Sequence, residues 1–269
     1  MTAITPLTRT PQAVAHVADR EPWTALGPAD APGIVFIHGT RLTRAQWWMQ
    51  VRLLSVRYRC VAVDLPGHGV LGTEAFTFDA AVDVVRRAVE AEVASGRAVL
   101  VGLSLGGYVA IEMAETDPDR VAGLVLAGCS AEALGPMALP YRFFRALLTR
   151  GSAPAQRLVN NGYFRLRYGR RIAGPIIEGG FWAAGGAAAL TALIGRRYLD
   201  RLARLWTPVL VVNGALDPVF APQGEYWAAS CRRGRHVLVP RAMHLSNLDR
   251  PVTFARLVAR FTDEATRRA

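Results

Sequence analysis

Residues 98–107 read Ala-Val-Leu-Val-Gly-Leu-Ser-Leu-Gly-Gly, a short apolar run that passes directly into a glycine-flanked serine. The apolar run predicts a strand, and residues 105–116 predict the helix that follows it. A turn this sharp strains the backbone of its central residue, and Gly102 and Gly106 remove the side chains that would clash there. The hydroxyl of Ser104 is then exposed beside a helix N-terminus, which favours developing negative charge. The stretch therefore predicts a nucleophilic serine, with a plain helix cap as the alternative.

Short apolar runs of the same kind recur on both sides of this turn. They contain no polar residue and are rich in branched side chains, which is typical of strands that are covered on both faces of a parallel sheet. These runs are residues 34–37, 60–63, 98–101, 124–126 and 208–212, with a further one at 237–239. Between them, residues 78–95 place valines at helical spacing on one face, which predicts a surface helix with a buried stripe. The alternation predicts an α/β fold with a doubly wound, mostly parallel sheet.

The alternation of strands and helices lapses between about residues 131 and 206 and then resumes. This interval contains Gly/Ala-rich and aromatic–arginine stretches without strand character. Because the sheet continues beyond it, we expect a helical insertion rather than an independent domain. The predicted organisation is a core made of residues 1–130 and 207–269, with residues 131–206 as a helical lid over one end of the sheet.

Composition excludes several classes of protein. The chain has 269 residues, of which 51% are hydrophobic and 20% are charged, which argues against a disordered or fibrous protein. The formal net charge is +11, and every basic residue is an arginine. No zinc finger, RNP-type motif or aromatic–basic alternation accompanies this charge, so the sequence does not predict nucleic-acid binding.

The sequence predicts a protein without cofactor, metal or disulfide, in the cytoplasm. Cys60, Cys129 and Cys231 are too widely spaced for a disulfide framework or a zinc site. No cluster of acids and histidines has the spacing of metal ligands, and no G-x-G-x-x-G opens the first helix. The first residues contain no apolar signal-like run, and the longest uncharged stretch, residues 179–195, is short for a membrane span. The sequence predicts no oligomeric state.

An unassisted serine is a poor nucleophile, so a base and an orienting acid are expected elsewhere in the chain. Asp217 follows the apolar run at 208–212, and His244 follows the run at 237–239. Because parallel strands end at one edge of the sheet, both side chains are expected at the same edge as Ser104. His38 and His68 lie in glycine-containing turns, where loop geometry explains them, and Asp64 is expected to fix a turn by hydrogen bonding.

With these residues in place, the sequence resembles the α/β-hydrolase superfamily over nearly its whole length, in its serine-nucleophile, esterase- or haloperoxidase-like branch. The resemblance implies that Ser104 is the nucleophile, His244 the general base and acid, and Asp217 the orienting carboxylate. It also implies an oxyanion hole formed by the backbone N–H groups of Thr40 and Leu105. The matching stretches are Ile-His-Gly-Thr at 37–40, Asp-Leu-Pro-Gly-His-Gly at 64–69, residues 102–106, Gly-Ala-Leu-Asp at 214–217 and residues 243–247.

The predicted reaction is hydrolysis of an ester, thioester or lactone through an acyl-enzyme. Carbon–carbon bond hydrolases, perhydrolases and non-hydrolytic lyases or cyclases on the same scaffold remain alternatives, as does a ligand receptor that keeps the triad. A carboxylate nucleophile, as in epoxide hydrolases and haloalkane dehalogenases, is argued against by the serine at position 104.

Two features of residues 131–206 predict how a substrate is recognised. Apolar residues are expected to line an acyl pocket over Ser104: Ile176, Ile177, Phe181, Trp182, Leu190, Leu193 and Ile194. Twelve arginines share the segment with only three acids, which predicts a substrate that is anionic or bound to an acidic carrier, with Arg41 near the pocket mouth. Ordinary core packing and a solvated basic face are the respective alternatives.

Overall fold

Seven strands form one sheet in the computed structural model, which describes residues 21–267. His16, to which the sequence assigns no role, lies outside the described residues. The strand order is β1-β3-β2-β4-β5-β6-β7, and every neighbouring pair is parallel except β1 with β3. The predicted mostly parallel sheet is therefore confirmed, and the antiparallel edge strand β1 is an addition. The strands are β1 (Trp23–Leu26), β2 (Gly33–Ile37), β3 (Arg59–Val63), β4 (Ala98–Leu103), β5 (Val121–Ala127), β6 (Val209–Gly214) and β7 (Gly234–Val239).

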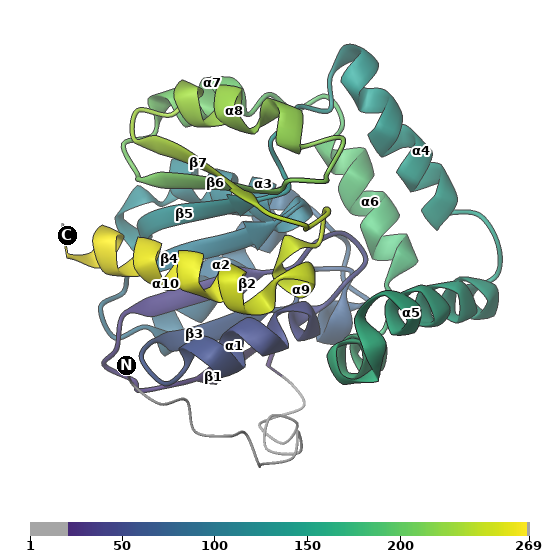
Figure 1. Cartoon of the computed structure of the whole chain (residues 1–269), viewed down its shortest axis with the longest axis horizontal. Helices are drawn as coiled ribbons and strands as arrows, with labels where there is room; N and C mark the ends of the chain where they lie inside the picture. The colour runs from purple at the N-terminus through teal and green to yellow at the C-terminus, as the bar shows by residue number, and fades with distance from the viewer. Residues whose placement is uncertain (1–20, 268–269) are drawn as a thin grey trace.

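Helices cover both faces of this sheet, as a doubly wound fold requires (Figure 1). On one face α1 (Trp48–Leu54) and α10 (Pro251–Thr266) bury one side of the central strands. On the other face lie α2 (Phe78–Glu92), α3 (Leu105–Thr116) and α8 (Gly224–Ser230). The strands β2, β4, β5 and β6 are buried along their whole length, which explains why their sequences carry no polar alternation.

The helix α2 shows why its sequence folds as predicted. The hydroxyl of Thr77 accepts a hydrogen bond from the N–H of Ala80 and caps the first turn, and Val82, Val85 and Val89 form the buried stripe. The helix ends at Glu92, three residues earlier than the expected position 95, because Val93 is extended.

Residues between β5 and β6 include four α-helices, which are α4 (Ala138–Leu148), α5 (Ala153–Gly179), α6 (Ala183–Leu193) and α7 (Leu199–Arg204). The helix α5 is kinked at Gly169, whose φ of 70° interrupts the helical backbone. Figure 1 shows α4, α5 and α6 together at one end of the sheet. In the part of the chain that the structure describes, no single helix is long and apolar enough to cross a membrane. The bent pair α5 and α6 meets that criterion by length and composition only, across an angle of 81°.

The three cysteines do not form a disulfide with one another. Cys60, Cys129 and Cys231 are free and buried, and burial raises the pKa of each thiol. Between residues 21 and 267 no group of three or more His, Cys, Asp or Glu side chains could hold a metal ion.

Candidate active site

Ser104 stands on the sharp turn between β4 and α3. Its backbone has φ 53° and ψ −117°, a conformation that side-chain-bearing residues rarely adopt. A Cβ atom built on Gly102 would lie 2.2 Å from the carbonyl oxygen of Gly106, and one built on Gly106 would lie 2.1 Å from the oxygen of Ile37. The predicted strained turn is present, and its two glycines are required by the close approach of α3 to the sheet.

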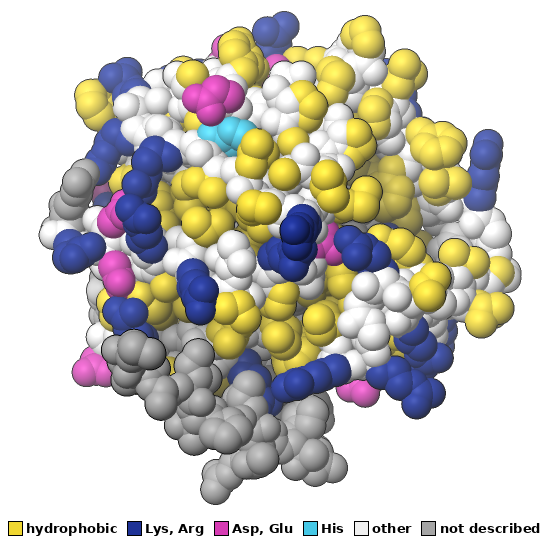
Figure 2. All heavy atoms as spheres, in the orientation of Figure 1, with side chains coloured by type: hydrophobic (Ala, Val, Ile, Leu, Met, Phe, Trp, Pro, Cys, Tyr) yellow, Lys and Arg dark blue, Asp and Glu magenta, His cyan; other side chains and the backbone are white. Residues whose placement is uncertain are grey.

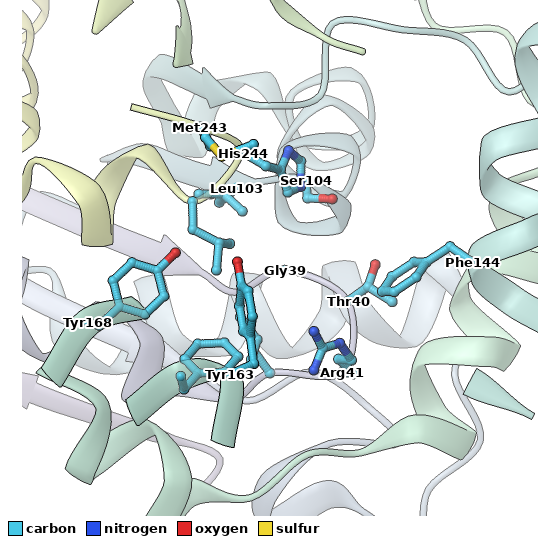
Figure 3. A pocket seen from close by; sticks show the side chains of 13 residues that line it. Gly39, Thr40, Arg41, Leu103, Ser104, Phe144, Tyr163, Tyr168, Met243 and His244 are labelled. Atoms are coloured by element: carbon cyan, nitrogen blue, oxygen red, sulfur yellow. The ribbon is translucent and has the colours of Figure 1, made fainter. Parts of the chain in front are cut away.

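His244 and Asp217 meet at the same edge of the sheet. Nδ1 of His244 lies 3.0 Å from Oδ2 of Asp217, and the imidazole stacks on the ring of Phe220 with centroids 5.0 Å apart. Gly128 leaves room for this ring, because a Cβ there would approach the imidazole to 3.0 Å. Figure 3 shows His244 beside Ser104, so the structure brings the three predicted side chains together.

The carboxylate of Asp217 is buried and well supplied with donors. Oδ1 accepts hydrogen bonds from the N–H groups of Val219 and Phe220, at 3.0 and 3.1 Å. Burial alone would raise the pKa of Asp217, but the interaction with His244 and the two N–H donors outweigh burial and hold the pKa below its ordinary value. The group is therefore an anion near neutral pH and can stabilise a charged imidazole.

The loop after β2 presents a row of backbone N–H groups with different partners. The N–H of Gly39 donates to Oε1 of Gln46 at 2.8 Å, and the N–H of Arg41 donates to Nε2 of His68 at 3.2 Å. For the N–H of Thr40, which lies between them, the described residues supply no acceptor. Thr40 lines both cavities next to Ser104.

The side chains of His38, His68 and Asp64, which were assigned to turns, accept hydrogen bonds from backbone N–H groups there. The N–H of Leu65 donates to Nε2 of His38 at 3.0 Å, and Nε2 of His68 accepts from Arg41. Asp64 accepts from the N–H groups of Arg44 and Val70, which confirms that it fixes the turn. Burial lowers the pKa of His38 to about 4 and that of His68 to about 3, so both rings are neutral acceptors at neutral pH.

This pair of buried histidines predicts a loss of stability in acid. In the unfolded chain both rings bind a proton as the pH falls below about 6.5, whereas in the folded protein they stay neutral until about pH 4 and 3. Unfolding therefore takes up protons, and each histidine lowers the free energy of unfolding by about 2 kcal/mol between pH 7 and 5. In denaturant titrations His38→Gln, which keeps an acceptor for Leu65, is expected to lose about 2 kcal/mol less than the wild type over this range. An equal loss in both proteins would contradict this account.

Two cavities meet at Ser104. Their volumes are about 270 and 310 Å³, and both are lined by Thr40, Ser104, Phe144 and His244. Most of the lining of the first cavity is apolar, but we call it the polar cavity because the guanidinium of Arg41 and the hydroxyls of Tyr163 and Tyr168 belong to it. Phe164 and Met243 also line it, and Figure 3 shows several of these residues around it. The apolar cavity, the second, is completed by Pro140, Tyr141, Leu190, Leu193, Asp217, Pro218, Val219 and Phe220.

Only two of the seven residues expected to form an acyl wall line one of these cavities. Leu190 and Leu193 of α6 line the apolar cavity. Ile176, Ile177, Phe181, Trp182 and Ile194 are not among the lining residues of either cavity. Because α5 ends at Gly179 and the chain turns sharply into α6, the ring of Trp182 points at Gly72, where a Cβ would approach it to 2.1 Å. Phe181 instead packs on Phe164 and beside the guanidinium of Arg41.

The arginines of residues 131–206 are partly neutralised by acids from outside that segment. Arg196 and Arg201 pair with Glu112 of α3, Arg201 and Arg204 pair with Glu115 of α3, and Arg167 pairs with Asp249. The other eight form no ion pair with a described residue: Arg142, Arg145, Arg150, Arg157, Arg165, Arg170, Arg171 and Arg197. Figure 2 shows dark-blue arginines and yellow apolar side chains together over the side of the molecule that carries α4 and α5.

Several lining residues were not predicted from the sequence. Phe144 of α4 and Tyr163, Phe164 and Tyr168 of α5 form much of the polar cavity, and Asn160 binds Arg41. The available signal was the run of aromatic residues between arginines at 141–171, which indicates helices but not the direction in which their faces point.

Comparison with known proteins decides the family. A sequence model of the alpha/beta hydrolase family matches residues 34–257. The chain belongs to the alpha/beta hydrolase family. A pimeloyl-[acyl-carrier protein] methyl ester esterase from Edwardsiella ictaluri is 29% identical over 90% of this chain and 96% of its own length. A 3-oxoadipate enol-lactonase from Acinetobacter baylyi is 25% identical over 87% and 90% of the two chains.

Solved structures of alpha/beta hydrolases agree with the fold. A hydrolase from Pseudomonas aeruginosa superposes with a TM-score of 0.74 at 28% identity, and covers 89% of this chain and 92% of its own. Together with the relatives named for ester and lactone hydrolysis, this places the protein among enzymes of the carboxylic ester hydrolase type.

Proposed function

We propose that the protein is a serine hydrolase that cleaves an ester, thioester or lactone of a small molecule through an acyl-enzyme on Ser104. The observation that carries the proposal is the 3.0 Å contact between Nδ1 of His244 and the buried carboxylate of Asp217, beside a serine in a strained backbone conformation. Strain of this kind persists at functional sites because the surrounding structure holds it.

The residues divide the reaction between them. Because Nδ1 of His244 is bonded to Asp217, Nε2 is left to take the proton of Ser104 as the hydroxyl attacks the carbonyl carbon. The tetrahedral intermediate collapses when His244 passes that proton to the leaving oxygen or sulfur, and the acyl group stays on Ser104. A water molecule then repeats the sequence, with His244 as base and Ser104 as leaving group, and releases the acid.

Two backbone donors are proposed to hold the negative charge of the tetrahedral intermediate. One is the N–H of Thr40, which the described residues leave without an acceptor, and the other is the N–H of Leu105 in the first turn of α3. Donors of this kind are worth about 2.7–4 kcal/mol each in other hydrolases.

Residues 131–206 are proposed to act as a lid on a core formed by residues 1–130 and 207–269. Side chains of α4, α5 and α6 line the two cavities opposite Ser104, so this segment shapes the space that a substrate occupies. The apolar cavity, with Leu190 and Leu193, suits a hydrocarbon part of the substrate.

A carrier-bound substrate is a second candidate. Eight arginines of the segment lack an ion-pair partner among the described residues, and exposed apolar side chains such as Phe143, Leu158 and Leu166 lie among them. An acidic carrier protein would complement this surface, and one relative is named for a carrier-bound methyl ester.

A substrate panel tests the proposal. It contains p-nitrophenyl esters of graded chain length, lactones, acyl-CoA thioesters and a methyl ester of a dicarboxylic acid attached to acyl carrier protein. Turnover of an ester, thioester or lactone is expected, and a large preference for the carrier-bound ester over the same free ester would establish the second candidate. A protein that turns over none of these but splits a carbon–carbon bond, or cyclises or eliminates without water, would contradict hydrolysis.

A further inference from the structure

Arg41 places a guanidinium inside the polar cavity. It follows Thr40 directly, and Figure 3 shows it on the side of the cavity that faces Ser104 and His244. Its Nη1 donates a hydrogen bond to Oδ1 of Asn160, a neutral acceptor on α5. Among the described residues no carboxylate forms an ion pair with Arg41.

The surroundings of this guanidinium are aromatic. Its Cζ lies 5.8 Å from the ring centroid of Phe144, 6.0 Å from that of Phe164 and 5.5 Å from that of Phe181. Such rings attract a cation weakly, but they also take water away from it. Burial accordingly lowers the pKa of Arg41 from its ordinary value.

The backbone fixes where the side chain points. Arg41 has a positive φ of 62°, its N–H donates to His68, and its carbonyl oxygen accepts the N–H of Trp182 at 2.8 Å. Arg41 is thereby held between the core and residues 131–206. The guanidinium of Arg41 is therefore positioned by a strained backbone that is anchored at two points, and not by a flexible surface loop.

Several other partly buried arginines have carboxylate partners, whereas the guanidinium of Arg97 has only the carbonyl oxygen of Val121 among the described residues. Arg44, three residues after Arg41, pairs with Asp64, Arg59 pairs with Glu92, and Arg201 pairs with Glu112. Removing a guanidinium from water without a counter-charge is unfavourable, so such groups are normally paired. Arg41 has five N–H donors, and Asn160 accepts from one nitrogen only.

We propose that Arg41 is a specificity-determining residue that binds a carboxylate carried by the substrate. The proposal rests on the hydrolase function proposed above and names its substrate class. A planar guanidinium fork matches a carboxylate with two parallel hydrogen bonds. A single positive charge among neutral rings is balanced by a monoanion, whereas a phosphate dianion would leave a net charge in the cavity. The hydroxyls of Tyr163 and Tyr168, in the same cavity, supply further donors.

Two pairs of esters test which substrates depend on Arg41. Mono-p-nitrophenyl adipate and the corresponding amide-ended ester place the carboxylate on the acyl side, and 4-acetoxybenzoate and 4-acetoxybenzamide place it on the alcohol side. In at least one pair Arg41→Gln is expected to lower kcat/KM of the carboxylate ester by about 10- to 100-fold, while the amide ester changes less than about threefold. Arg256→Gln, an equal charge change at an exposed position on α10, is expected to alter neither.

The result differs if Arg41 has only a structural role. If it only pins α5 to the loop, Arg41→Gln lowers kcat/KM for both members of each pair by the same factor, which overturns the proposal. Arg41→Lys, which keeps the charge but not the planar fork, is expected to recover only part of the preference for the carboxylate.

Binding without turnover separates this inference from the hydrolase proposal. Calorimetric titration of monomethyl adipate into Ser104→Ala and into Ser104→Ala/Arg41→Gln is expected to give a Kd at least tenfold higher for the double variant. Equal Kd values, or no binding to either protein, would overturn the carboxylate site, even if fluorophosphonate labelling showed a reactive serine. Conversely, Arg41-dependent binding in a protein that no fluorophosphonate labels would overturn the hydrolase function alone.

Discussion

Replacing Ser104 with alanine is expected to lower kcat on activated esters by about 10⁵- to 10⁶-fold. The substitution removes the only atom proposed to bond to the acyl group, while Gly102 and Gly106 still allow the turn. Alanine also fits the cavity without new contacts, so the thermal unfolding midpoint is expected to change little. Steady-state and single-turnover hydrolysis of a p-nitrophenyl ester measures the effect.

Ser95→Ala is the matched control, because Ser95 is exposed in the turn before β4, at the opposite end of that strand from Ser104. It is expected to keep wild-type kcat. If Ser104→Ala kept its physiological turnover, the pocket would act by orienting its substrate, and a lyase or cyclase function would replace the hydrolase proposal. Ligand binding without turnover in the wild type would instead indicate a receptor.

Asp217→Asn is expected to lower kcat by about 10⁴-fold. The carboxylate accepts from Nδ1 of His244 with one oxygen and from the N–H groups of Val219 and Phe220 with the other. An amide held by the same two N–H groups turns its NH₂ toward His244. The imidazole must then accept at Nδ1 and carry its proton on Nε2, where it cannot take the proton of Ser104.

A substitution that removes the same charge at an exposed position is the control for this prediction. Asp200→Asn, at an exposed position of α7, removes the same charge and is expected to leave kcat unchanged. A decrease of kcat by less than tenfold in Asp217→Asn would show that Asp217 does not orient the imidazole. The thermal unfolding midpoint of that variant is measured alongside, because the substitution can also lower stability.

Much of the core could be predicted because its signals are local. The strands β4 and β6 are buried along their length, so their sequences are continuous apolar runs, and α3 begins and ends where residues 105–116 were expected. The edge strand β1 escaped detection because only one neighbour pairs with it and its four residues are half-exposed or exposed. The roles of Ser104, Asp217 and His244 in catalysis stay predictions, although their placement at one edge of the sheet follows from the strand ends.

The cavity walls could not be predicted because they depend on contacts between distant segments. The turn after α5 sends Trp182 toward Gly72, and nothing in the sequence around residues 179–183 gives that direction. The charge count of residues 131–206 likewise missed Glu112 and Glu115, which lie in the core helix α3 and neutralise arginines more than eighty positions away. By contrast, Arg41 was placed near the pocket by its position after Thr40.

The most direct test of the acyl-enzyme account is the site at which a fluorophosphonate reacts. The wild-type protein is treated with the reagent and digested, and the modified residue is identified by mass spectrometry. The account predicts one adduct, on Ser104, that is absent in Ser104→Ala and formed much more slowly in Asp217→Asn. A protein that hydrolyses esters at its wild-type rate while Ser104 stays unmodified, or whose adduct forms on another residue, would contradict it.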